Sequence, residues 1–150
     1  MKASRLELPP PSHAGLALQR YLKEHDDENK AARELLEHIA QSGVPPVYAQ
    51  AFQRWKESLK EAVFLEATTR TPLAIGLGNS SPLENGLALH HTYGVPYLPG
   101  SALKGLLRRV AERYGLSQQE QAVLLGEGSD LMRKIYGSAG YLVYWDGWLD

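Results

Sequence analysis

Residues 90–105 have the sequence HHTYGVPYLPGSALKG and hold several groups suited to binding an anion. Pro99 favours an extended residue before it, Gly100 allows the backbone to turn or to approach a ligand closely, and Ser101 is a suitable N-cap for a following helix. Lys104 then falls in the first turn of that helix. The first N–H groups of a helix lack helical partners and the helix dipole is positive there, so a phosphate is favoured. We predict a phosphate site at this helix start.

The same segment offers little for catalysis. Because Lys104 precedes Gly105, the segment does not match a nucleotide-hydrolysing P-loop. Adjacent histidines in a strand point to opposite faces, so His90 and His91 are poorly placed to ligate one metal ion together. Either could act as a general base on a ribose 2′-hydroxyl, since histidine titrates near neutral pH. The acidic residues near the motifs are not closely spaced: Glu66, Glu84, Asp130 and Asp146. We expect no catalytic activity, no metal and no cofactor.

The composition is that of an ordinary globular chain of 150 residues, with 43% apolar and 22% charged residues. A formal net charge of −1 gives no overall field that attracts nucleic acid, so an anion site must be local. The absence of cysteine excludes disulfides and thiolate metal sites. No apolar run reaches the roughly 20 residues that span a bilayer, and the start lacks a signal-peptide core. We expect a soluble, cytoplasmic protein with no membrane contact.

The first third of the chain is patterned for short helices after a proline-rich arm. Three consecutive prolines make residues 8–12 an extended arm. Apolar spacing predicts one helix around residues 16–22 and another around residues 35–39, with Asp26 or Asp27 as the cap of the second.

A clearer helix is predicted from Pro46 to Lys60. Its apolar residues recur at helical spacing: Tyr48, Phe52, Trp55 and Leu59. Periodic aromatic residues usually face inward, so we interpret this stripe as core packing rather than a surface for stacking RNA bases.

The spacing then changes from helical to alternating. In residues 62–75 the apolar side chains fall mainly at odd-numbered positions and the polar ones at even-numbered positions. This alternation predicts the clearest strand of the sequence. A polar, turn-rich segment follows at 76–86, and residues 87–91 are predicted to form a second short strand. The end of the chain alternates again, with Tyr141, Val143 and Trp145 on one face of a predicted strand.

Three helices are predicted between these strands. The first runs from Ser101 to Tyr114 and ends at Gly115; its apolar face leaves cations on both flanks, Lys104 with Arg108 and Arg109 with Arg113. The sequence SQQE at 117–120 predicts a capping box and a helix to about residue 125. The third is predicted within residues 129–137.

Two segments, GLGNSSPLENGLALHHTYGVPYLPGSALKG and IYGSAGYLVYWDGWLD, resemble the RAMP superfamily of RNA-guided CRISPR effector proteins. Within it, the histidine pair and the helical N-terminal region are similar to the sixth subunits of type III-B Cmr complexes. The resemblance covers residues 62–150 well and the N-terminal helices loosely. The proline–glycine–serine–lysine–glycine core is shared across the superfamily.

The resemblance implies an α+β, ferredoxin-like fold related to the RNA-recognition motif, with the 62–75 strand first and the 101–114 helix packed on the sheet. The domain organisation that follows is an arm with helices at residues 1–61 and a RAMP region at residues 62–150, in one compact domain overall. Family members are considerably longer, so the resemblance also implies a truncated chain or a fragment whose sheet another chain completes.

The function implied is that of a noncatalytic subunit that binds guide RNA, with target RNA and other Cmr subunits as further partners. Self-association is a further expectation if the chain is truncated. On this interpretation the predicted RNA ligands are the residues of the helix start together with nearby cations, turn residues and an aromatic ring: Gly100, Ser101, Lys104, Arg108, Arg70, Asn79, His90, His91 and Tyr93.

Simpler roles remain open for several of these residues. Lys104 could be an ordinary surface lysine, Arg70 could pair with a carboxylate across the sheet, and Asn79 could satisfy only its own loop. Two other functions also remain open. One is a guide-processing RNA endonuclease that uses His90 or His91 as its base, and the other is a protein-interaction module that never touches RNA.

Overall fold

The computed structural model describes residues 13–83, 86–126 and 139–150. The chain divides into two compact units, the first formed by residues 1–97 with 149–150 and the second by residues 98–148. The predicted boundary after residue 61 therefore falls inside the first unit. The helix predicted within residues 129–137 lies outside the described residues.

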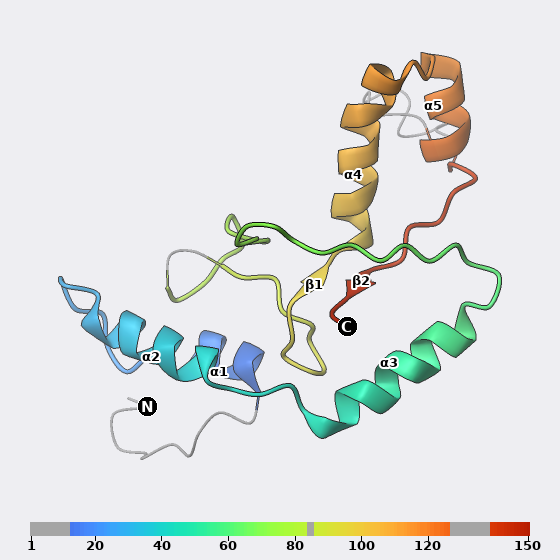
Figure 1. Cartoon of the computed structure of the whole chain (residues 1–150). Helices are drawn as coiled ribbons and strands as arrows, with labels where there is room; N and C mark the ends of the chain where they lie inside the picture. Colours follow the sequence, from blue (N-terminus) through green and yellow to red (C-terminus); the bar gives the residue numbers. More distant parts are fainter. Residues whose placement is uncertain (1–12, 84–85, 127–138) are drawn as a thin grey trace. The chain divides into compact units, whose positions relative to one another are not determined.

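Two short helices of the first unit pack against each other, α1 (Ala14–Arg20) and α2 (Lys30–Ala40) (Figure 1). Their buried residues are Ala17, Leu18 and Leu35, which confirms both predicted helices. The start of α2 is stabilised by the Asp26 carboxylate, which accepts hydrogen bonds from the Lys30 and Ala31 N–H groups at 2.8 and 2.9 Å. The prediction that Asp26 or Asp27 caps this helix is thus confirmed for Asp26.

The third helix, α3 (Pro46–Ser58), begins with proline at its first position and carries the predicted aromatic stripe. Tyr48 and Phe52 are buried and their rings stack with centroids 6.2 Å apart. The Tyr48 hydroxyl donates to the Leu149 carbonyl oxygen at 2.6 Å, and burial raises the pKa of Tyr48. The packing interpretation is confirmed for these two residues.

Residues 62–75 do not form a strand, contrary to the prediction. The backbone of residues 63–74 makes no hydrogen bond within the described part of the chain, and Val63 and Leu65 are 89% and 90% exposed. An alternating segment becomes a strand only when a neighbour accepts its ladder of hydrogen bonds and covers its apolar face. The described residues supply no such neighbour, so the segment is extended and exposed.

The next segments are two turns closed by backbone hydrogen bonds. Ala88 N–H donates to the Ile75 carbonyl oxygen at 2.7 Å and closes the glycine-rich loop. Further along, Leu89 and Pro96 form an isolated antiparallel bridge, which is all that the structure shows of the strand predicted at 87–91. Gly94 lies in the turn between them with φ +67°, a conformation that favours glycine.

The second unit contains α4 (Gly100–Ala111), continued by a 3-10 helix (Glu112–Tyr114), and α5 (Gln118–Leu125), which packs against α4 (Figure 1). Gly115 ends the first helix with φ +80°, as predicted. Ser117 and Glu120 form the predicted capping box, and the hydrogen bond from the Ser117 N–H lowers the pKa of Glu120.

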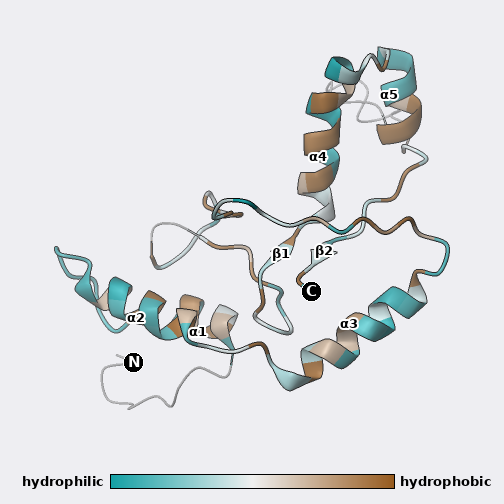
Figure 2. Cartoon of the chain, viewed as in Figure 1, coloured by the Kyte–Doolittle hydropathy of each residue, from teal (hydrophilic) through white to brown (hydrophobic). Residues whose placement is uncertain are grey.

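The apolar face predicted on α4 is only partly covered. Figure 2 shows alternating apolar and polar bands along this helix, but Leu106, Leu107 and Tyr114 are exposed in the described structure. The buried residues of α4 are Gly100 and Ala111, at its two ends. The prediction that this helix packs by its apolar face on a sheet is therefore not met by the described residues, which contain no sheet large enough to receive it.

The sheet is small. It consists of two strands, β1 (Tyr97–Leu98) and β2 (Gly147–Trp148). Tyr141 and Val143, predicted on one face of a longer final strand, are exposed and lie outside any strand. The fold is thus a mixture of helices and a small sheet. Among the described residues, no helix is long and apolar enough to cross a membrane.

Candidate functional site

The start of α4 is occupied by a carboxylate of the chain itself. The Asp146 side chain accepts a hydrogen bond of 2.7 Å from the Gly100 N–H. An anion at this position is favoured by the helix dipole and by the unpaired N–H groups of the first turn. Asp146 therefore supplies, at Gly100, the negative charge that the sequence predicts for an external phosphate.

Gly100 is required by packing within the second unit. It is buried, and a Cβ atom added there would overlap the carbonyl oxygen of Tyr144. The close approach predicted at this glycine is therefore made by the chain's own backbone. Contact of Gly100 with RNA stays a prediction.

Ser101 is not the N-cap of this helix, contrary to the prediction. The N-cap is Pro99, and Ser101 lies inside the first turn without a side-chain capping bond. The Pro99 carbonyl oxygen accepts hydrogen bonds from the N–H groups of Ala102 and Leu103 at 2.9 and 3.1 Å. Because the cap lies two residues earlier than predicted, the Ala102 N–H is also already bonded.

The cations on α4 differ in their surroundings. Lys104 is partly exposed, while Arg109 and Arg113 are exposed, and none of the three makes a hydrogen bond or ion pair with the described residues. Unpaired cations on one helix can bind phosphate without breaking an internal contact. Lys104 and Arg109 on α4, and Arg113 on the 3-10 helix that continues it, are therefore positive charges without a partner in the described part of the chain.

Arg108 has an internal role. Its Nη2 donates to the carbonyl oxygens of Leu125 and Gly126 at 3.0 and 2.9 Å, at the end of α5. The last carbonyl groups of a helix lack helical partners, and a cation is favoured beside them. Arg108 thus joins α4 to α5, and its predicted contact with RNA stays a prediction.

The predicted residues of the histidine-containing turn lie together in the first unit. The His90 ring lies against Tyr93, with centroids 4.8 Å apart, and Tyr93 meets Tyr48 edge to face at 5.6 Å. His90 Nδ1 accepts a hydrogen bond from the Thr92 N–H at 3.2 Å. Tyr93 therefore packs in the aromatic cluster of α3, and its stacking on a base stays a prediction. His91 is exposed.

Arg70 and Asn79 are exposed in the first unit. Arg70 makes no ion pair with the described residues, so the alternative of a cross-strand carboxylate partner is not found there. The Asn79 N–H donates to the Gly76 carbonyl oxygen at 2.9 Å, which closes a turn. A Cβ atom at Gly86 would lie 2.7 Å from the Asn79 carbonyl oxygen, so this loop is tightly packed. No group of three His, Asp or Glu side chains suited to a metal ion occurs among the described residues.

A comparison with protein families matches residues 66–148, more than half of the chain, to the RAMP superfamily. The chain belongs to the RAMP superfamily. The CRISPR system Cmr subunit Cmr6 of Pyrococcus furiosus is 32% identical over 90 residues, which are 59% of this chain and 25% of that protein. The chain spans about a quarter of the length of this relative. No solved structure was found to match. The predicted resemblance is thus confirmed.

Two residues with a structural role at the RAMP motif were not identified from the sequence. The first is Asp146, which the sequence shows only as one of several acidic residues that are not closely spaced; its contact with Gly100 was missed. The N–H groups left unpaired at a helix start signal that an acceptor is needed, but not which one.

The second missed residue is His13, which lies before the RAMP match. Its Nδ1 accepts the Leu16 N–H at 3.1 Å as the cap of α1, and its Nε2 lies 3.0 Å from the His91 carbonyl oxygen. Its position immediately before the first helix was the available signal.

Proposed function

We propose that this RAMP chain is a noncatalytic, RNA-binding part of a type III-B CRISPR effector subunit. The observation that carries the proposal is a set of cations that have no partner among the described residues: Lys104 and Arg109 on α4 and Arg113 on the 3-10 helix that continues it, all within the segment that matches the RAMP superfamily. The name of the Pyrococcus furiosus relative supports the assignment to a Cmr complex. In this role the cations bind RNA phosphates, and the protein does not recognise a specific base sequence.

Salt dependence tests the role of Lys104. Neutralising one phosphate contact changes the slope of log affinity against log salt by about 0.7 for single-stranded nucleic acid. We expect Lys104→Ala to weaken binding of a single-stranded RNA to the full chain and to reduce that slope by about 0.7. Lys60→Ala is the control, because Lys60 is exposed and lies outside the RAMP match. Equal affinity and slope for Lys104→Ala and the unchanged chain would contradict the assignment.

Absence of catalysis is part of the proposal. His90 is engaged by the Thr92 N–H and by aromatic rings, an arrangement that serves packing. We expect the purified chain to leave labelled repeat RNA intact. Site-specific cleavage that His90→Ala or His91→Ala abolishes would instead establish the alternative of a guide-processing endonuclease.

The proposed partners are guide RNA, target RNA and other Cmr subunits. Crosslinking of the assembled effector followed by peptide mapping separates this proposal from a module that binds only protein. We expect RNA adducts on peptides from residues 90–109. Crosslinks from these peptides to protein subunits alone would favour the interaction module.

We further propose that residues 62–75 become a strand of a ferredoxin-like sheet in the assembled effector. The alternating pattern and the exposure of Val63 and Leu65 support this role. Hydrogen exchange is the test. We expect backbone amides of residues 63–69 to exchange rapidly in the isolated chain and slowly in the effector. Rapid exchange in both would show that the segment does not pair.

A further inference from the structure

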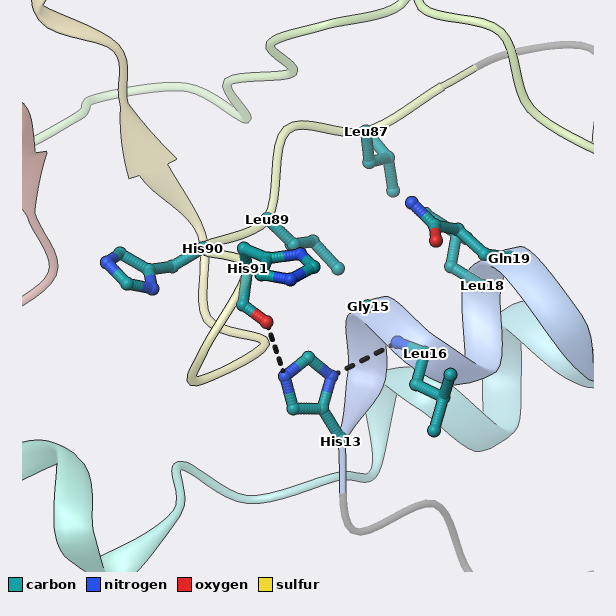
Figure 3. Close-up of a pocket in the computed structure, with 9 residues that line it drawn as sticks. All are labelled: His13, Gly15, Leu16, Leu18, Gln19, Leu87, Leu89, His90 and His91. Atoms are coloured by element: carbon teal, nitrogen blue, oxygen red, sulfur yellow. Dashed lines mark hydrogen bonds between the residues drawn. The ribbon is translucent and has the colours of Figure 1, made fainter.

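The first unit contains a cavity of about 310 Å³ between α1 and residues 87–91 (Figure 3). Its walls are leucines from both sides, Leu16 and Leu18 on α1 and Leu87 and Leu89 on the facing segment. Figure 3 shows the Leu89 and His91 side chains directed toward α1, whereas the His90 ring points away from it. The cavity size is at the lower end of the range for small-ligand sites, about 300–1,000 Å³.

The two walls are held together by His13. Its Nδ1 accepts the Leu16 N–H on the α1 side, and its Nε2 donates to the His91 carbonyl oxygen on the other. Gly94 lies so close that a Cβ atom there would be 2.9 Å from the Ala14 nitrogen. A site whose walls are already joined loses little conformational entropy on binding.

Two polar side chains at this cavity have no partner among the described residues, Gln19 and His91. Both are exposed. The Gln19 amide can donate and accept hydrogen bonds, and a neutral imidazole can do the same. No Lys, Arg, Asp or Glu belongs to the described lining. The cavity therefore suits a neutral group with apolar faces and a polar edge, and does not suit a phosphate.

We propose that this cavity binds one unpaired nucleobase of a single-stranded RNA, an inference that rests on the proposed RNA-binding function. A base is flat, its faces contact leucine and imidazole side chains favourably, and its edge offers donors and acceptors to Gln19 and His91. Phosphates stay outside the cavity, where charge is not excluded. An apolar side chain of a partner protein would contact the leucines but would form no hydrogen bond with Gln19 or His91.

The first test compares intact RNA with the same RNA made abasic throughout, using the unmodified 150-residue chain. Both RNAs carry the same phosphates, so the comparison measures the contribution of the bases, and the variants at Gln19 and His91 assign it to the cavity. We expect the abasic RNA to bind roughly tenfold more weakly, the effect of losing one stacked base. Equal affinities would overturn the proposal and favour a protein side chain as the occupant.

The second test uses variants. We expect Gln19→Ala and His91→Ala each to weaken binding of intact RNA and to leave binding of abasic RNA unchanged. Gln50→Ala and His38→Ala are the matched controls, since both residues are exposed on other helices. A variant that weakens both RNAs equally, or neither, would overturn the assignment.

The outcomes separate this inference from the function beneath it. If both RNAs bind equally and Lys104→Ala weakens both, the chain binds RNA backbone and the base site is wrong. If neither RNA binds to the chain, the proposed function and the base site both fail.

Discussion

The surroundings of Gly100 and Gly105 determine whether each position can accept a side chain. Both lie in α4 and in the same RAMP motif. A Cβ atom at Gly100 would overlap the Tyr144 backbone, whereas one at Gly105 would meet no atom within 4 Å. The sequence motif marks both glycines alike, and only the fold distinguishes them.

We expect Gly100→Ala to lower the free energy of unfolding by about 1–3 kcal/mol, because the Tyr144 carbonyl must move. Gly105→Ala should raise it by about 0.5–1 kcal/mol, since alanine is the better helix residue where there is room. Denaturant titration followed by circular dichroism measures both. A loss of stability for Gly105→Ala as large as that for Gly100→Ala would contradict this packing.

At the scale of the secondary-structure elements, a helix cap depends on residues that are close in the sequence. Ser117 was correctly predicted to cap α5 from the SQQE pattern, because both partners of a capping box lie within one turn. Ser101 was wrongly predicted as the cap of α4. A serine can act as the N-cap only if the helix begins at the residue that follows it. Here the helix begins at Gly100, so Pro99 is the N-cap and Ser101 lies inside the first turn.

Ser117→Ala should therefore destabilise the chain by about 1 kcal/mol through loss of the cap. Ser101→Ala should cost nothing or stabilise slightly, because its hydroxyl caps no helix and alanine has the higher helix propensity. Thermal unfolding of the two variants side by side measures the difference. Equal destabilisation would restore Ser101 as a cap.

The start of α2 should respond to acid. Hydrogen bonds from Ala31 and Lys30 hold the pKa of Asp26 below its usual value. The ionised carboxylate stabilises the helix fully above the pKa of a free aspartate, near 4, and this stabilisation is lost as the pH falls through the lower pKa of the folded state. In an acid titration followed by far-ultraviolet circular dichroism, Asp26→Asn should remove this part of the transition.

The neighbouring Asp27 is the control for that titration. It is exposed in the turn before α2, and no hydrogen bond joins its side chain to the described residues. Asp27→Asn should keep the acid transition of the unchanged chain. If the two variants behave alike, Asp26 is not the group that titrates.

The whole molecule consists of two units that hold separate buried residues. Tyr48 and Phe52 belong to the first, Ala111 and Leu125 to the second. Cooperative opening follows contiguous packing, so each unit is expected to open by itself.

Gly100→Ala tests this division by hydrogen exchange. We expect faster exchange of backbone amides in α4 and α5 and unchanged exchange in α3, because the strained contact lies within the second unit. Uniform acceleration in all helices would show that the two units open together.

The sequence alone determined the features that depend on near neighbours. Helices α1, α2, α3 and α5, the Asp26 cap and the Gly115 stop all follow from side chains within about one turn of each other. The RAMP family was also evident, because its motif is a local run of residues. These interactions form wherever the rest of the chain lies.

Only the tertiary structure decided what the predicted site contacts. Asp146 meets Gly100 across 46 residues, and His13 meets His91 across 78. No local pattern specifies such partners, because they depend on how separate segments come together. For the same reason residues 62–75 do not form the predicted strand: their sequence alternates between apolar and polar residues, but a strand also needs a neighbouring strand to pair with. At the helix start the Gly100 N–H thus binds the chain's own Asp146, while Lys104 has no partner among the described residues and its contact with phosphate stays a prediction.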